Sequence, residues 1–301
     1  MMKRFFSYVE IKTKITSLFA FLISLAYLFY RGQQINWRNT VVFFAAMFIF
    51  DLTTTAINNY IDTKTNDQVL QFNRKTALAI IYMMFVISAA LGLYLVYLTD
   101  IVVLLVGGLC FLTGVLYTYG PVPISRQPLG ELLSGIFYGL FIPFIMLYIN
   151  MPEGSIIKLG LGWERISLDI AVMPVLAVLL LSVAPVCTTA NIMLANNICD
   201  VEKDIAVKRY TLPYYLGKRS LQLFALLYYL CYAAVIAMVT FKLLSPLCLL
   251  ALLTLWPVQK NINIFFRRQE KSETFITSIK NYVLIMGSIS VLIFISALIR
   301  F

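Results

Sequence analysis

The sequence predicts an all-α membrane protein, a polytopic transmembrane bundle of about nine helices. Hydrophobic residues make up 61% of the 301 residues and charged residues only 13%, which is not the composition of a soluble domain. The apolar residues occur in runs of about 16 to 24, long enough to cross a bilayer as helices, and short polar loops separate the runs. The lipid bilayer is therefore the first partner that the sequence implies.

The expected spans follow from the apolar runs taken in order. They lie at about 15–30, 40–61, 77–98, 101–118, 129–149, 169–195, 220–241, 243–258 and 276–299. The first run follows a basic N-terminal stretch, but no small-residue cleavage site precedes Arg31, so we expect it to remain as a helix. The longest break, about residues 150–168, has only Pro and Gly as turn formers. We therefore expect residues 1–301 to form one integral-membrane domain.

The composition also excludes several classes of chemistry. Histidine is absent, which removes His-based acid or base catalysis, His-ligated zinc and His-ligated haem. The five Cys residues are scattered through apolar stretches without a CxxC pair, as buried free thiols are. The net charge of +10 comes from short loops between spans, which favours contact with anionic lipid or an anionic substrate over nucleic acid.

Two polar motifs lie at the C-terminal ends of two of the apolar runs. In ANNICDVEKD (195–204), Asn196, Asp200 and Asp204 are spaced i, i+4 and i+8, so on a helix they stack along one face, which we call the second ladder. NNYIDTKTND (58–67) repeats the NNxxD pattern at the end of an earlier run. Its Asn58 and Asp62 form the first ladder.

The side chains of these ladders are hard oxygen ligands. Carboxylates and carboxamides without His or thiolate select Mg²⁺, Ca²⁺ or Mn²⁺, and Mg²⁺ usually completes its shell with water and phosphate oxygens. Basic side chains that could bind oxyanions lie near both ladders: Lys64, Arg74, Lys75, Lys203, Lys208, Arg209, Lys218 and Arg219. Acids that hold metal beside bases that hold phosphate predict a diphosphate site. The alternative is a set of solvated charges at a membrane edge.

These residues also carry a family resemblance. NNYIDTKTND and NNICDVEKD resemble the two aspartate-rich motifs, NDxxDxxxD and DxxxD, of the UbiA superfamily of intramembrane prenyltransferases. YTYGPVPISRQPLGEL (117–132) and DVEKDIAVKRYTLPYYLGKRS (200–220) are similar to the 1,4-dihydroxy-2-naphthoate polyprenyltransferases of menaquinone synthesis. The resemblance extends from about residue 8 to the last span.

The resemblance implies transfer of a polyprenyl group from polyprenyl diphosphate to dihydroxynaphthoate, with loss of the ring carboxylate, giving demethylmenaquinone. It implies two Mg²⁺ ions, one held by Asn58, Asp62 and Asp67 and the other by Asn196, Asp200 and Asp204. It further assigns Asp62 and Asp200 to catalysis, and it assigns diphosphate binding to Lys64, Arg126, Lys208 and Arg209. Tyr117, Tyr119 and Phe137 are candidate aromatic neighbours of the prenyl or acceptor group, where aromatic faces could stabilise an allylic cation. The alternative is that these three are packing or interfacial residues.

The sequence departs from the family pattern in four places. Asn59 stands where the first motif usually has Asp, and Asp67 is displaced by one position, about 100° around a straight helix from the ladder face. Either the first metal site is less acidic or the helix unwinds before Asp67. Cys199 replaces a residue that is often basic. The YxxxK element is unmatched, and Tyr119 and Arg126 could substitute only if the loop between them folds back.

Two further acids lie within predicted spans. Asp51 is at i−7 from Asn58, on the same helix face and about two turns deeper, where a charged group usually faces a cavity. We expect Asp51 to be catalytic, binding an acceptor hydroxyl or taking the proton released on substitution. The alternative is a carboxyl satisfied by Thr54, Thr55 or another helix. Glu131 has the same ambiguity, with a structural role favoured.

Orientation and the competing functions complete the expectations. Of the 24 Lys and Arg residues, 18 lie on the side of the two ladders and six on the other, so the positive-inside rule makes the ladder side cytoplasmic. We expect a multi-pass protein of a bacterial cell membrane with a cytoplasmic active site and no protein partner. Prenyl length and oligomeric state stay open. A family member with another acceptor (4-hydroxybenzoate or haem) is the second interpretation, and a cation transporter, whose site should lie near the midplane, is the third.

Overall fold

A computed structural model describes residues 2–64, 69–120 and 123–299. Within this part of the chain, eight helical segments are long and apolar enough to cross a membrane, and Ile101–Leu116 is a shorter apolar helix. The predicted all-α bundle of about nine helices is confirmed, and the chain is an integral, multi-pass membrane protein. Two compact units divide it: one contains Met1–Leu18 and Ile35–Ile124, and the other Phe19–Gln34 and Ser125–Phe301.

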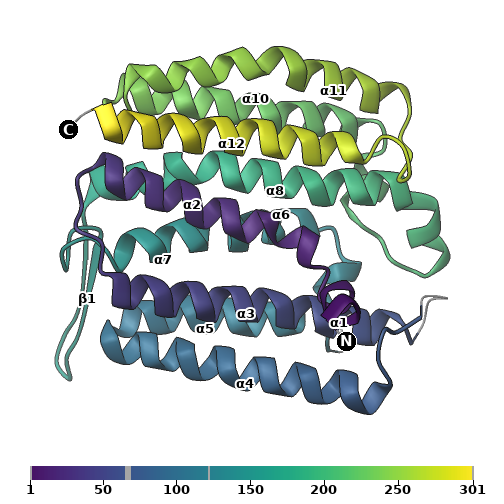
Figure 1. The fold of residues 1–301 in the computed structure, drawn as a ribbon, viewed down its shortest axis with the longest axis horizontal. Helices are drawn as coiled ribbons and strands as arrows, with labels where there is room; N and C mark the ends of the chain where they lie inside the picture. The colour runs from purple at the N-terminus through teal and green to yellow at the C-terminus, as the bar shows by residue number, and fades with distance from the viewer. Residues whose placement is uncertain (1, 65–68, 121–122, 300–301) are drawn as a thin grey trace. The chain divides into compact units, whose positions relative to one another are not determined.

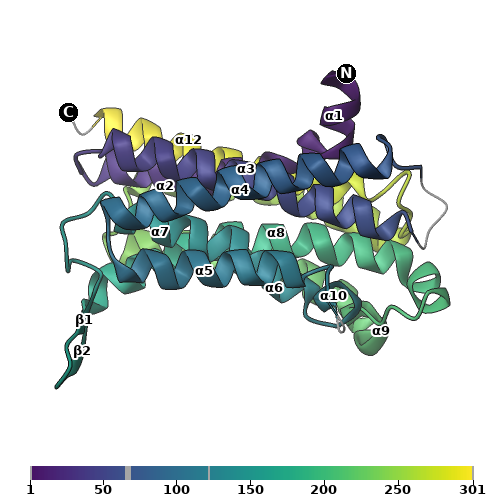
Figure 2. The ribbon, with the colours of Figure 1, turned by 90° about the horizontal axis from the view of Figure 1, so that it is seen from below.

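The first unit is built from antiparallel helices. Its elements are α1 (Met2–Tyr8), a 3₁₀ turn (Ile11–Lys14), the start of α2 (Ile15–Tyr30), α3 (Trp37–Asp62), α4 (Arg74–Leu98) and α5 (Ile101–Leu116). Helices α3 and α4 lie side by side (Figures 1 and 2). Helices α3, α4 and α5 are preceded by the N-cap residues Asn36, Asn73 and Asp100, whose side chains each accept a hydrogen bond from a backbone N–H of the first turn. Such N-caps explain why the helices begin at these residues.

Tyr8 ties the N-terminal segment of the first unit to its long helices. Its ring is fully buried in a cluster with Leu52 and Ala56 of α3 and Ile81 of α4. The Tyr8 hydroxyl donates a hydrogen bond of 3.0 Å to the carbonyl of Ala56. A buried Tyr hydroxyl needs such a partner, so the contact fixes where the N-terminal segment meets α3.

The second unit is arranged around one long helix. Its elements are the rest of α2, α6 (Gly130–Ile136), a π-helical turn (Phe137–Phe141), α7 (Ile142–Tyr148), β1 (Ile157–Leu161), β2 (Ile166–Ile170), α8 (Val172–Ala206), α9 (Leu212–Leu216), α10 (Arg219–Thr240), a 3₁₀ helix (Pro246–Thr254), α11 (Leu255–Arg267) and α12 (Ile276–Ile299). Helix α8 packs against α6, α10 and α12 (Figure 1). The polar ladder at the end of α8 is therefore carried by a helix that packs against three others.

Two glycines allow the π-helical segment to approach α8 closely. A Cβ at Gly139 would collide with the backbone of α8 at Pro185 and Val186, and a Cβ at Gly135 would come within 2.9 Å of the Val186 carbonyl. Small residues four apart are the usual means by which membrane helices pack backbone to backbone. The contact lies where Pro185 interrupts the hydrogen-bond ladder of α8.

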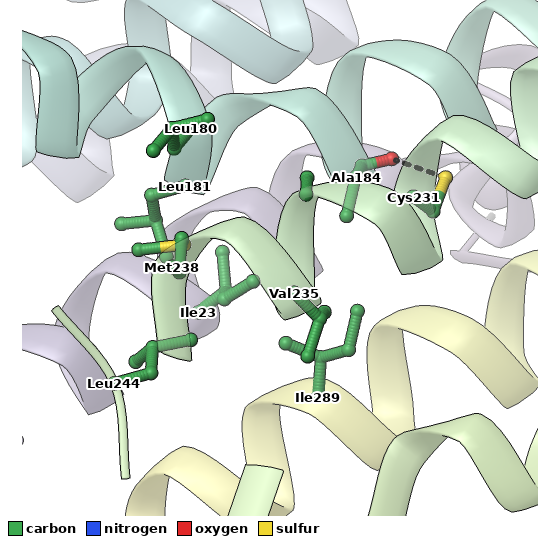
Figure 3. Close-up of a pocket in the computed structure, with 10 residues that line it drawn as sticks. Ile23, Leu180, Leu181, Ala184, Cys231, Val235, Met238, Leu244 and Ile289 are labelled. Carbon is green, nitrogen blue, oxygen red and sulfur yellow. Dashed lines mark hydrogen bonds between the residues drawn. The ribbon is translucent and has the colours of Figure 1, made fainter. Parts of the chain in front are cut away.

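A narrow cavity of the second unit lies between α8 and α10. Figure 3 shows its lining, which is entirely apolar apart from a thiol: Ile23, Leu180, Leu181, Ala184, Cys231, Ala234, Val235, Met238, Leu244 and Ile289. The Cys231 thiol points to the Ala184 carbonyl at 3.9 Å. A lining of this kind stays dry, so we regard the cavity as a packing defect.

Three predicted segments were wrong in detail. The break at 150–168 contains a β-hairpin, whose alternating Ile and Leu residues pair across the two strands. The span predicted at 169–195 begins later, at Val172, and its helix continues to Ala206 as the helical spacing of the ladder predicts. The span predicted at 243–258 begins as 3₁₀ helix and extends to Arg267, because Val258, Ile262 and Phe265 form a buried stripe that continues the helix.

Candidate active site

The second ladder lies on one face of an unbroken helix. Because α8 stays helical beyond Pro185 to Ala206, Asn196, Asp200 and Asp204 follow one another at one turn each, as the sequence predicts. Asp204 is buried, and Asp200 is largely covered. Two carboxylates and an amide therefore share one strip at the C-terminal end of the helix.

Each carboxylate of the second ladder has a cationic partner. Lys271, from the loop between α11 and α12, forms an ion pair with Asp200. The guanidinium of Arg209 lies 3.7 Å from the Asp204 carboxylate. Arg209 was predicted for this site, but Lys271 was not. Only its place on the basic side of the membrane could have suggested Lys271, because it lies 71 residues from its partner.

The end of α8 folds Arg209 back over the ladder. Lys208 adopts a left-handed conformation with φ 56°. The Lys208 N–H donates to the Ile205 carbonyl at 3.0 Å, and the Arg209 N–H donates to the Asp204 carbonyl at 2.8 Å. This pair of bonds is a Schellman motif, which satisfies the last carbonyls of a helix. The backbone thereby fixes Arg209 beside Asp204, while the Lys208 side chain remains exposed.

Glu131 and Asn197 extend this cluster into the protein. Glu131 is only 3% exposed, and its Oε1 accepts a hydrogen bond of 2.8 Å from the Asn197 amide. The Asn197 carbonyl oxygen in turn accepts a hydrogen bond of 3.5 Å from Arg209. The second Asn of the NNxxD motif thus links Glu131 to Arg209, and these contacts support the structural role that was favoured for Glu131.

The first ladder lies at the C-terminal end of α3. Asn58 Oδ1 accepts a hydrogen bond from the hydroxyl of Thr118, and Asp62 is the exposed last residue of the helix. The Asn59 side chain binds the N-terminal segment instead, because its amide donates a 2.8 Å hydrogen bond to the Tyr8 carbonyl. Asp67, the third predicted ligand, lies outside the described residues, so its role stays a prediction.

Basic side chains surround the end of α3. Arg74 donates to the carbonyls of Tyr60 and Thr63, each at 3.0 Å, and so binds the unsatisfied end of the helix. Lys64 is exposed, with its ammonium 5.0 Å from the centroid of the Tyr60 ring. Of these two cations, only Lys64 keeps its charged group clear of the helix carbonyls, which is compatible with its predicted role in diphosphate binding.

Asp51 is buried in an ion pair. Its carboxylate lies 2.8 Å from the Lys14 ammonium and accepts a 2.6 Å hydrogen bond from the Ser17 hydroxyl. Lys14 also contacts Thr55, whereas Thr54 bonds only to the Asp51 backbone carbonyl. The geometry favours the structural alternative for Asp51, with Lys14 as the partner that sequence reasoning missed. Its catalytic role stays a prediction.

The remaining predicted residues are spread over both units. Tyr117 directly follows α5 and is half-buried, and Tyr119 is 64% exposed. Arg126 belongs to the second unit; its side chain is exposed, and its carbonyl accepts a 3.2 Å hydrogen bond from the Tyr210 N–H. Phe137 packs edge-on against Phe141 within the π-helical turn. The substitution of Tyr119 and Arg126 for YxxxK stays a prediction.

The ladders carry oxygen donors of the kind that bind a divalent cation. Both ladders end their helices, where the helix dipole is negative and disfavours a carboxylate by about 0.3–1 kcal/mol. Carboxylates placed there need cations, and in the second ladder Lys271 and Arg209 already supply two. Among the described residues, no group of three His, Cys, Asp or Glu side chains gathers around one point. Amide and water or phosphate oxygens would therefore have to complete the shell of Mg²⁺.

Comparison with known proteins identifies the family. The model of the UbiA prenyltransferase family matches residues 17–280. The chain belongs to this family. The match includes both ladders, so Asp62, Asp200 and Asp204 lie within the matched residues.

Individual relatives agree with this assignment. The 1,4-dihydroxy-2-naphthoate octaprenyltransferase of Bacillus subtilis (strain 168) is 30% identical over 173 residues, which are 57% of this UbiA family chain and 49% of the relative. The match thus spans about half the length of that curated relative.

Solved structures share the fold over nearly the whole chain. A UbiA homolog from Aeropyrum pernix K1 in its apo form superposes with a TM-score of 0.63 at 16% identity, covering 95% of this chain and 98% of that one. A UbiA homolog from Archaeoglobus fulgidus, bound to GPP and Mg²⁺, gives a TM-score of 0.56 at 13% identity and covers 95% and 99%. At these identities the likeness establishes the fold.

Proposed function

We propose that this protein is a Mg²⁺-dependent prenyltransferase that transfers a polyprenyl group from polyprenyl diphosphate to 1,4-dihydroxy-2-naphthoate. The decisive observation is the second ladder, in which Asp200 and Asp204 lie one turn apart with Lys271 and Arg209 beside them. Oxygen ligands next to cations suit a metal-bound diphosphate. The Archaeoglobus fulgidus homolog, bound to GPP and Mg²⁺, supports this ligand class.

Different residues of the chain would hold the metal ions and bind the departing diphosphate. Asn196, Asp200 and Asp204 would hold one Mg²⁺, and Asn58, Asp62 and Asp67 a second. Bound there, the metal would neutralise diphosphate oxygens and make the group easier to displace. Arg209, Lys208 and Lys64 would bind the departing diphosphate, since fixed cations stabilise charge that develops as the bond breaks. Arg126 would assist them.

The acceptor and the allylic carbon must meet away from water. Loss of diphosphate leaves an allylic cation that water would trap, so the reaction requires a site from which water is excluded. Tyr117 and Tyr119 are proposed to line that site, where the faces of their rings could stabilise the cation. Attack by the dihydroxynaphthoate ring at the carbon that bears its carboxylate, followed by loss of CO₂, gives demethylmenaquinol, the hydroquinone form of demethylmenaquinone. Asp51 remains a proposed acceptor of the hydroxyl proton.

The naphthoate acceptor rests on the Bacillus subtilis relative and on the segments 117–132 and 200–220. Another aromatic acceptor, such as 4-hydroxybenzoate, is the second candidate. A cation transporter is disfavoured because both ladders lie at helix ends, whereas transporter sites lie near the midplane. We further propose a bacterial cell membrane with the ladders on the cytoplasmic side, because 18 of the 24 basic residues lie on the ladder side.

The test uses purified protein in lipid with Mg²⁺ and a polyprenyl diphosphate. Dihydroxynaphthoate and 4-hydroxybenzoate are supplied in parallel, and products are read by mass spectrometry. We expect a prenylated, decarboxylated naphthoquinol as the product. The product should be lost in the variant Asp200→Asn and retained in the control variant Glu153→Gln, which neutralises an exposed acid far in sequence from both ladders. Prenylation of the benzoate alone would refute the acceptor, and no product from either acceptor in folded protein would refute the reaction.

A further inference from the structure

The hairpin between α7 and α8 has one apolar and one polar face. Its strands pair antiparallel, and alternate residues of a strand face opposite sides. Three cross-strand pairs consist only of Ile and Leu and share one face: Ile157–Ile170, Leu159–Leu168 and Leu161–Ile166. The two pairs between them share the other face: Lys158–Asp169 and Gly160–Ser167. The hairpin is therefore amphipathic along its whole length.

Most of the apolar face is uncovered by protein. Leu161, Ile166 and Leu168 are 59–72% exposed, and Trp163 in the turn is fully exposed. A two-stranded hairpin is marginally stable in water without something packed on its apolar face. A contiguous exposed patch of this kind marks an interaction surface.

The position of the hairpin identifies what covers this face. Two membrane spans flank it, because the span Gly130–Tyr148 precedes it and α8 begins two residues after β2 ends. Figures 1 and 2 both show the hairpin running across the direction of α7 and α8. An element that runs across the spans from their ends extends along the membrane surface. Trp is the residue typical of that interface.

We propose that the hairpin, Ile157–Ile170, lies on the bilayer surface with its Ile/Leu face and Trp163 in the interfacial layer of the lipid. Its polar face, with Lys158, Ser167 and Asp169, faces water. The unpaired edge groups of the strands remain hydrated there, as they could not in the hydrocarbon core. This surface is at the end of α8 opposite the second ladder, so the inference does not depend on the proposed enzymatic function.

The experiment uses the natural fluorescence of the turn. The chain has three Trp residues, so the full-length double variant Trp37→Phe/Trp256→Phe leaves Trp163 as the sole reporter. It is reconstituted in phosphatidylcholine vesicles with and without brominated acyl chains. We expect blue-shifted emission, loss of intensity in the brominated lipid and protection from aqueous iodide.

Neighbouring positions on opposite faces provide the matched controls. Leu168→Asp, made in the single-Trp protein, should shift the emission to the red and restore quenching by iodide, whereas Ser167→Asp should leave both unchanged. Water-like emission of Trp163 with full access to iodide would overturn the proposal. A second outcome would also overturn the proposal: a blue-shifted emission that brominated lipid does not quench, and whose blue shift is lost as the protein is diluted into excess lipid. That result would mean that a second copy of the chain covers the apolar face.

Discussion

The buried pair of Lys14 and Asp51 allows a stability prediction with a worked magnitude. Both side chains are 5% exposed and their charged atoms are 2.8 Å apart. At an effective dielectric constant of about 20 the attraction is roughly 6 kcal/mol, and desolvation of both groups offsets much of it. Removing one partner leaves the other charge buried and alone, which costs about 3–5 kcal/mol. We therefore expect Lys14→Met or Asp51→Leu alone to lower the free energy of unfolding by that amount.

The double variant is the decisive comparison. Lys14→Met/Asp51→Leu removes both charges while filling a similar volume, so we expect it to recover most of the lost stability. Unfolding in mixed micelles of dodecyl sulphate, followed by circular dichroism, gives the coupling energy of the cycle. If the loss of unfolding free energy in the double variant equals the sum of the losses in the two single variants, the pairing is refuted. If the double variant regains stability and prenyl transfer together, Asp51 is structural; stability without activity would support its catalytic role.

Three further predictions concern the second unit. Gly139→Ala should destabilise the protein by about 1–3 kcal/mol or more, because its Cβ would collide with the backbone of α8; Gly287→Ala, which meets only a side chain at 3.9 Å, should be neutral or stabilising in the same unfolding assay. Lys271→Met removes the cation that competes for the Asp200 carboxylate, so half-maximal activity should need several-fold less Mg²⁺; a higher Mg²⁺ requirement would contradict this assignment. Asn197→Leu removes the amide donor of a buried carboxyl and should cost about 1–3 kcal/mol, and unchanged stability would show that this hydrogen bond is not formed in the membrane.

The helices that carry the ladders could be predicted because their signals are local. Apolar runs of membrane-spanning length predict the helices, and NNxxD at their ends predicts oxygen ligands at helical spacing. The structure confirms that Asn196, Asp200 and Asp204 lie on one continuous helix. The last turns of that helix are polar, so the hydropathy pattern stops before them, and the helical spacing of the ladder predicts the helix there instead.

The partners of the site residues could not be predicted, because they come from distant segments. Lys271 is 71 residues from Asp200 and Lys14 is 37 residues from Asp51. Nothing in the local sequence distinguishes these two lysines from their basic neighbours. The sequence therefore indicates which acids need partners without indicating which cations supply them.

The hairpin differs, because its signal is present in the sequence. The segments IKLGL and ISLDI alternate apolar and small or polar residues and are separated by four residues, which is typical of paired strands. Its place between membrane spans made a loop the simpler prediction. The alternation of apolar with small or polar residues is recognisable when the two segments are considered apart from the flanking membrane spans.

The length of α8 has a consequence for how substrate reaches the protein. Its 35 residues make a helix about 52 Å long, whereas the hydrocarbon core is about 30 Å thick. Even at a tilt of 40°, the core accounts for only about 39 Å of it, so at least two turns extend beyond the acyl chains. Under the proposed function, and with this excess at the C-terminal end of α8, a lipid-like substrate would keep its tail among the acyl chains while its charged head met Asp200 and Asp204 at the level of the phospholipid head groups, without leaving the membrane.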